Sequence, residues 1–70
     1  MPWSNADLSK AEENVERARA IVAQQRRLIA EMRRNGRRTV AAEATLRTME
    51  QTLRTLENHR DTVKQHTKRE

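Results

Sequence analysis

The sequence has 70 residues and contains no cysteine, phenylalanine or tyrosine, with only one tryptophan, one glycine and one proline. The lack of cysteine excludes disulfides and thiolate metal sites. No run of 18 apolar residues occurs, so we expect no membrane-spanning segment. The N-terminus also lacks the basic and then apolar pattern of a secretion signal. We therefore expect a cytoplasmic location.

Hydrophobic residues are scarce and charged residues are common. They make up 34% and 36% of the chain, respectively. A chain of this length forms one domain at most. Two helices that touch along a single line bury less apolar surface than so small a domain needs, so we expect the chain to oligomerise or to be marginally stable alone.

The first half of the chain has the pattern of a long helix. Ser4 and Asp7 have the spacing of a capping box, and Trp3 and Leu8 that of a hydrophobic staple. From Leu8 the apolar residues recur at alternating steps of three and four, as in a heptad repeat abcdefg with apolar a and d positions. The a positions are Leu8, Val15, Val22 and Ile29, and the d positions are Ala11, Ala18, Gln25 and Met32.

The repeat is interrupted once, at Asn35-Gly36. Glycine after a polar residue is a strong helix stop, and Thr39 can cap a second helix. The pattern resumes with Thr39, Leu46, Leu53, Arg60 and Thr67 at a, and with Ala42, Met49, Leu56 and Val63 at d. We predict an all-α, antiparallel two-helix hairpin forming one domain over 1–70, with helices at about 4–35 and 39–64, a turn at 36–38 and a frayed tail at 65–70.

The charges test the register of this hairpin. Folding at Gly36 brings the e positions of the two helices opposite each other, and every resulting pair has opposite charges. The four pairs are Arg33 with Glu43, Arg26 with Glu50, Arg19 with Glu57, and Glu12 with Lys64. The same register places Val15 opposite Val63 and Arg60 opposite the small Ala18. A long continuous helix that pairs with another chain is the structural alternative, and Asn35-Gly36 argues against it.

The g positions form a second, mildly apolar face. Ile21 and Leu28 lie there on the first helix, and Thr45, Thr52 and His59 lie opposite on the second, beside Thr48, Thr55 and Thr62 at c. A threonine methyl group can pack while its hydroxyl bonds back to the helix. We expect this face to pair with a second copy, giving a homodimeric four-helix bundle, or to bind another protein.

The charge excess lies around the turn. Residues 26–38 hold six arginines and one glutamate, a net +5 that equals the net charge of the whole chain. Because Arg26 and Arg33 are expected to pair with glutamates, Arg27, Arg34, Arg37 and Arg38 remain for an anion or a nucleic acid. No aromatic residues interleave with them for base stacking, which favours an exposed charged loop over a nucleic-acid site.

No pattern for catalysis or cofactor binding is present. The chain has no glycine-rich phosphate loop and no nucleophile motif, and nothing sets two carboxylates apart as an acid and a base. His59 and His66 are too few to hold a metal ion. We expect no enzyme activity, no cofactor and no metal.

Three stretches carry a resemblance: residues 24–32, Gly36 with Thr39, and residues 46–53. They resemble a group of short uncharacterised bacterial proteins that share an RQRxLIAxL stretch, a Gly-x-x-Thr turn and an LxTxExTL stretch. The resemblance covers about 12–62 and implies a helical hairpin, without an activity. Arg37 and Arg38 stand where the group often has a His-Asp pair, so the basic turn departs from that pattern.

The sequence thus predicts a small non-enzymatic module for self-assembly or protein interaction. The alternative is a hairpin that binds nucleic acid through its basic turn.

Overall fold

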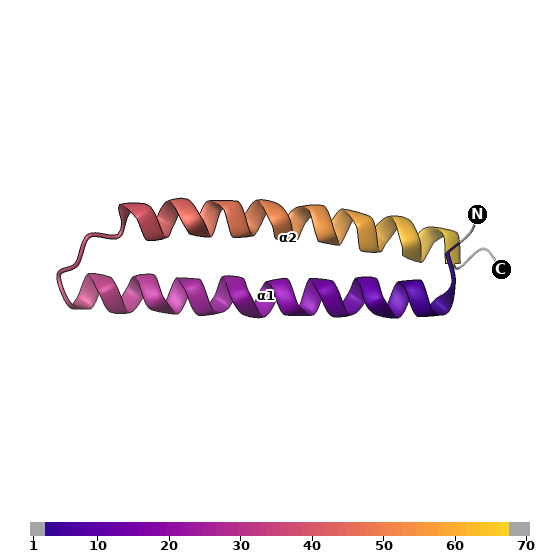
Figure 1. Cartoon of the computed structure of the whole chain (residues 1–70), viewed down its shortest axis with the longest axis horizontal. Helices are drawn as coiled ribbons and strands as arrows, with labels where there is room; N and C mark the ends of the chain where they lie inside the picture. The colour runs from indigo at the N-terminus through magenta and orange to yellow at the C-terminus, as the bar shows by residue number, and fades with distance from the viewer. Residues whose placement is uncertain (1–2, 68–70) are drawn as a thin grey trace.

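The computed structural model describes residues 3–67 and contains two long helices, α1 (Asn5–Arg34) and α2 (Val40–Thr67). They run antiparallel, side by side over their whole length, so the start of α1 and the end of α2 lie at the same end of the rod (Figure 1). The rod measures 54 × 15 × 11 Å. The predicted all-α hairpin is confirmed.

The start of α1 is fixed by the predicted capping box. The Asp7 backbone N–H donates to the Ser4 hydroxyl oxygen at 3.1 Å, and the Ser4 N–H donates to the Asp7 carboxylate at 2.9 Å. Because these hydrogen bonds favour the charged form, they lower the pKa of Asp7 below its ordinary value, the bond from the Ser4 backbone most of all. An acidic residue in the first turn also suits the positive end of the helix dipole.

The end of α1 is a Schellman motif. Gly36 has φ of +70°, a left-handed conformation that costs glycine little and other residues more. The Arg37 N–H donates to the Met32 carbonyl at 2.9 Å, and the Gly36 N–H donates to the Arg33 carbonyl at 3.1 Å. The turn therefore closes on the carbonyls that the end of the helix leaves without intrahelical partners.

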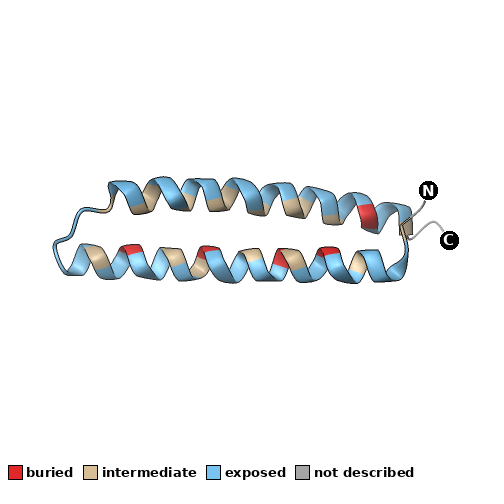
Figure 2. Ribbon diagram, in the orientation of Figure 1, coloured by how far each residue is buried: buried red, intermediate tan, exposed pale blue. Residues whose placement is uncertain are grey.

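The heptad seam, meaning the residues at a and d, is the core. No seam residue from Leu8 to Thr67 is exposed. The buried residues are Ala11, Val15, Val22, Ile29 and Val63. They lie on the sides of the helices that face each other (Figure 2). Val15 and Val63, predicted to lie opposite each other, are the largest fully buried side chains, at 1% and 0% exposure.

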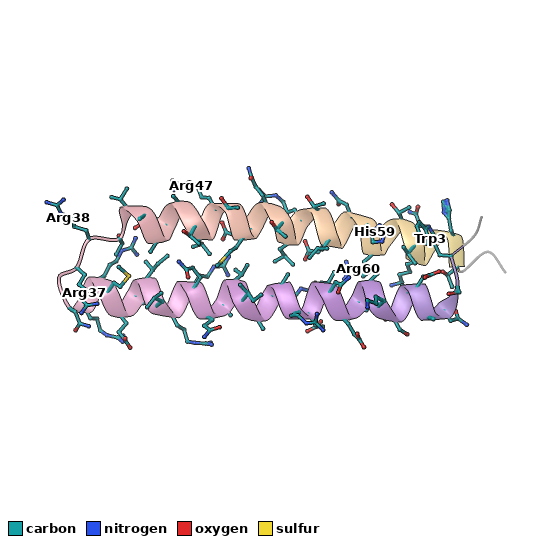
Figure 3. The ribbon with its side chains drawn as sticks, viewed as in Figure 1. Trp3, Arg37, Arg38, Arg47, His59 and Arg60 are labelled. Atoms are coloured by element: carbon teal, nitrogen blue, oxygen red, sulfur yellow. The ribbon has the colours of Figure 1, made fainter. Side chains whose placement is uncertain are left out.

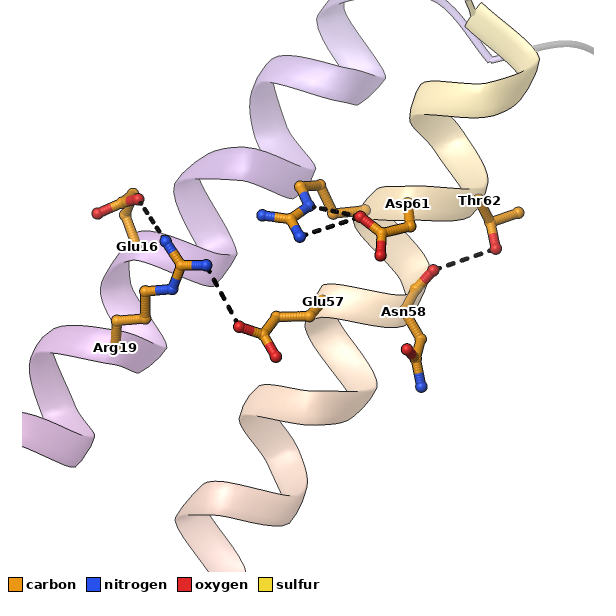
Figure 4. Close-up of polar contacts among 7 residues, drawn as sticks. Glu16, Arg19, Glu57, Asn58, Asp61 and Thr62 are labelled. Atoms are coloured by element: carbon orange, nitrogen blue, oxygen red, sulfur yellow. Dashed lines mark hydrogen bonds and ion pairs between the residues drawn. The ribbon is translucent and has the colours of Figure 1, made fainter.

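Besides Thr39 and Thr67 near the two ends of α2, the seam contains two polar residues, Gln25 and Arg60. The Gln25 side-chain amide crosses it and donates to the Ala42 carbonyl of α2 at 3.0 Å. Arg60 is half-buried, and its guanidinium pairs with the neighbouring Asp61 carboxylate at 2.9 Å (Figure 4). Only 24% of its side chain is exposed, as for a long charged residue whose stem is buried while its head stays paired.

The predicted end of the second helix was too early. α2 continues three residues beyond 64, because the Thr67 hydroxyl is held close to both the Val63 carbonyl, at 2.8 Å, and the Trp3 carbonyl, at 3.3 Å. This long-range contact within the chain ties the end of α2 to the segment that precedes α1. The rest of the predicted frayed tail, residues 68–70, lies outside the described residues. Within residues 3–67, neither helix is long and apolar enough to cross a membrane.

Candidate functional site

The two sides of the seam differ. On the e side, α1 arginines pair with α2 glutamates: Arg33 with Glu43 at 2.6 Å, Arg26 with Glu50 at 2.7 Å, and Arg19 with Glu57 at 3.3 Å. These are three of the four predicted pairs, and they confirm the register. Figure 4 shows the third pair, with Arg19 also reaching Glu16 of its own helix. Each exposed pair is worth only about 0.2–1 kcal/mol, so the pairs select register more than they stabilise the hairpin.

The fourth predicted pair is not formed. Among the described residues, no ion pair joins Glu12 to Lys64. Both side chains are exposed. A lysine ammonium is compact and strongly hydrated, whereas a guanidinium presents a planar fork that matches a carboxylate. Lysine therefore stabilises a solvent-exposed ion pair less than the arginines of the other three pairs do.

The g side is open. We call the surface formed by Ile21 and Leu28 of α1, with Thr45, Thr52 and His59 of α2, the open face. All five residues are exposed, and Ile21 and Leu28 are 44% and 47% exposed. Unlike the e side, no salt bridge crosses between the helices here within residues 3–67. Among residues 3–67, Val40 at the start of α2 is a further large exposed apolar side chain, and it lies outside the open face.

A shallow groove runs along the open face. One section, of about 340 Å³, is lined by Ala18, Ile21, Thr45, Thr48, Met49 and Thr52. A second section, of about 500 Å³, shares Ile21 and Met49 with the first and extends to Leu28, Arg27 and Glu31. The shared residues make the two sections continuous. The first section is thus mainly apolar, whereas the second is mixed, because Gln24 and Gln25 also line it.

Threonine hydroxyls beside the groove bond to their own helix. The hydroxyls of Thr45, Thr48 and Thr62 donate to backbone carbonyls four residues earlier, at 3.1, 3.4 and 3.1 Å. This is the back-bonding expected from the sequence. Because these hydroxyls already have an acceptor, burying the threonines would leave no hydroxyl without a hydrogen bond. The threonine methyl groups can then pack against an apolar partner. From Ala41 to Thr62, the c and g positions of α2 carry no permanent charge.

Trp3 covers the end of the open face that is nearest the chain termini. Its ring packs edge to face on His59, with ring centroids 5.5 Å apart, and the two side chains lie close together at that end in Figure 3. The sequence predicted a staple between Trp3 and Leu8 but not this contact. The contact depends on the path of the chain before Ser4, which the heptad pattern does not encode.

The basic turn lies at the opposite end. Arg27, Arg34, Arg37 and Arg38 are exposed, and within residues 3–67 none of them forms a salt bridge. Figure 3 shows Arg38 projecting away from both helices. The structure thus brings the four predicted arginines to one end of the rod.

The first salt bridge below the turn is part of a small cluster. The Glu43 carboxylate accepts hydrogen bonds from the Thr39 hydroxyl and the Arg33 guanidinium, both at 2.6 Å. These bonds lower the pKa of Glu43 below its ordinary 4.5, the Thr39 bond most of all. Thr39 therefore fastens the start of α2 twice, since its hydroxyl donates to the Glu43 carboxylate and its carbonyl accepts the Glu43 backbone N–H at 2.8 Å. Its hydroxyl does not act as the predicted cap, because it donates to a side chain instead of accepting a backbone N–H.

No metal cluster is seen in the part of the chain that the structure describes, where no three His, Cys, Asp or Glu side chains come together. Comparison with protein families, curated proteins and solved structures found no match for this chain. The open face and the basic turn are therefore the candidate functional surfaces.

Proposed function

We propose that this chain is a non-enzymatic self-assembly module, in which two hairpins pack through their open faces into a four-helix bundle. The observation that carries the proposal is the pair of half-exposed apolar side chains, Ile21 and Leu28, set in a groove beside the uncharged α2 face. An apolar strip rimmed by polar residues is typical of an interaction site.

The surface area of the single hairpin supports the proposal. Its accessible surface is 5597 Å², whereas a compact monomer of the same 8.2 kDa exposes about 4,500 Å². The excess, about 1,100 Å² by that relation, resembles the ~800 Å² that each partner buries in a standard interface. The radius of gyration is 16.0 Å, against about 11 Å for a compact chain of this length. Pairing two rods side by side reduces both excesses.

The energy available from the open face is moderate. Full burial of an isoleucine or leucine side chain is worth about 1.5–3 kcal/mol. Because Ile21 and Leu28 are about half exposed, the four copies in a dimer contribute on the order of 3–6 kcal/mol. The cost of association offsets part of this gain. These two side chains alone therefore give a dissociation constant no tighter than tens of micromolar, so dimerisation should depend on concentration between tens of micromolar and the millimolar range.

Sedimentation equilibrium over that range, with helicity followed by circular dichroism, tests the proposal. The wild-type chain should be a helical dimer, and the Ile21→Asp plus Leu28→Asp variant should be a monomer with a lower melting temperature. A matched control, Ala20→Asp plus Ala44→Asp, adds the same charge at exposed positions on the outer surface and should remain dimeric. A monomeric wild type, or equal association of all three proteins, would refute the proposal.

A second candidate function is nucleic-acid binding through the basic turn, favoured by the absence of intrachain salt bridges at its four arginines within the described residues. Fluorescence anisotropy with labelled DNA and RNA should then show binding that weakens steeply with salt. Arg37→Ala plus Arg38→Ala should reduce affinity and flatten the salt dependence. The control Arg47→Ala plus Arg54→Ala removes equal charge from α2. No binding at low salt would eliminate this function.

A further inference from the structure

The open face also carries information on how two copies are oriented, an inference that rests on the proposed self-assembly. Two rods can pack face to face around a two-fold axis in two ways. An axis along the helices sets turn against turn and places each α1 over the partner's α2. An axis across the helices sets each turn against the partner's terminal half and places each α1 over the partner's α1.

We propose the second arrangement, with the two-fold axis passing beside Gln24 of each copy. This residue lies near the midpoint between Ile21 and Leu28, three residues after the first and four before the second, and the two are about 10.5 Å apart along α1. Antiparallel pairing about that point puts Ile21 on the partner's Leu28, and Leu28 on the partner's Ile21. The two large exposed apolar side chains of the groove are then buried against each other rather than against threonines.

The charges beside the groove fit the same register. Arg17 and Glu31 occupy c positions that flank Ile21 and Leu28 at equal distances along the helix from Gln24. Both are exposed, and within residues 3–67 neither forms a salt bridge in its own chain. In the proposed dimer Arg17 lies beside the partner's Glu31, and the symmetry repeats this pair. In the turn-on-turn dimer both residues would face the uncharged α2 face instead.

The basic turn opposes the turn-on-turn dimer directly. Residues 26–38 carry a net +5, and packing two such turns together would place like charges within about one Debye length, ~10 Å at 0.1 M salt. In the antiparallel dimer each turn meets the terminal half of the partner, where the charges of the chain are balanced. On α2, Thr45, Thr48 and Thr52 of the two copies then pack together, and no charge is buried there.

Cysteine cross-linking tests the position of the axis, because the natural chain has no cysteine. In a Gln24→Cys variant the two introduced thiols should lie beside each other, and mild oxidation should give a disulfide-linked dimer. The Ala20→Cys variant is the control, since Ala20 is exposed on the outer side of the same helix. It should cross-link far more slowly at the same protein concentration.

Charge reversal tests the register. Arg17→Glu and Glu31→Arg should each weaken dimerisation, and because each change acts at two symmetric pairs, the dissociation constant should rise about 2- to 30-fold. The double variant should restore most of the wild-type affinity, since the pair is rebuilt with its charges exchanged. Rescue would not occur if Arg17 and Glu31 never meet.

The outcomes separate this inference from the proposed function. A dimer that gains no selective cross-link at position 24 and shows no rescue overturns the antiparallel arrangement but leaves self-assembly standing. A wild-type chain that sediments as a monomer at every concentration overturns both. Selective cross-linking together with rescue supports the antiparallel dimer.

Discussion

The layer formed by Val15 and Val63 offers a sharp test of the hairpin register. Both side chains are fully buried, at 1% and 0% exposure, and the register set by the salt bridges places them opposite each other. Replacing either valine by alanine removes two methyl carbons at ~0.8 kcal/mol each, and the residual cavity adds to this loss. Each variant should therefore lose about 1.5–3 kcal/mol of unfolding free energy.

The informative quantity is the coupling between the two changes. Residues in contact show interaction energies of about 0.5–3 kcal/mol in a double-mutant cycle. Once Val15 is alanine, Val63 has fewer methyl groups to pack on, so its truncation should cost less than in the wild type. The double variant should thus be more stable than the two single losses predict.

Urea unfolding followed by circular dichroism measures this cycle. All variants are compared at one protein concentration, because self-association contributes to stability. Since a domain of this size has roughly 3.5–10 kcal/mol of stability, an osmolyte that strengthens apolar burial can keep the double variant folded. The control cycle combines Val63→Ala with Ile29→Val. Ile29 lies opposite Met49, and Met49 is about 21 Å from Val63 along α2, so Ile29 and Val63 do not touch. It should be additive within about 0.5 kcal/mol, and equal additivity for Val15 with Val63 would refute the register.

Three further predictions concern the turn and the e side. Gly36→Ala should cost about 1–2 kcal/mol in thermal or urea unfolding, because the residue has φ of +70° although nothing lies within 4 Å of an added Cβ; an unchanged stability would contradict the turn geometry. Hydrogen bonds from Thr39 and Arg33 hold the pKa of Glu43 below 4.5 in the folded chain. The charged carboxylate therefore stabilises the fold above pH 4.5, and this stabilisation is lost as the pH falls through the pKa of the folded state. Acid titration of Glu43→Gln should therefore show a smaller loss of stability below pH 4.5 than the wild type, and identical acid profiles would count against the contact. Arg26→Glu should lower stability in low salt and much less in 1 M salt, and Glu50→Arg should restore it, whereas a salt-independent effect without rescue would disprove the ion pair.

The heptad pattern predicted the core well for a physical reason. Apolar residues at a and d can be buried together only on one side of each helix, so the repeat determines both the helices and the sides that meet. A single glycine then decides between a hairpin and a continuous helix. Three arginine–glutamate pairs followed from that fold, because their spacing along α1 matches the spacing along α2 in reverse.

The contacts near the chain termini could not be predicted in the same way. Trp3 precedes the first helix, so its partner depends on a chain path that has no periodicity. The further extension of α2 depends on Thr67 reaching the Trp3 carbonyl, a contact between residues at opposite ends of the sequence. The unformed pair of Glu12 and Lys64 shows a third limit, since opposite charges at the right spacing do not ensure a bond between exposed side chains.

The two sides of the hairpin suggest a division of roles. On the e side, charges face each other across the seam and set the register within one chain. Charged residues make up 36% of the chain, yet the c and g positions of α2 from Ala41 to Thr62 carry no permanent charge. Beside them, α1 supplies Ile21 and Leu28. If the hairpin worked alone, charges on this side would aid solubility and would cost nothing in packing. In the proposed dimer this uncharged α2 surface is buried by a second copy, with Ile21 on Leu28 and Arg17 beside Glu31. Under that proposal, one side of the rod sets the fold and the other selects the partner, which is how the two sides differ in charge.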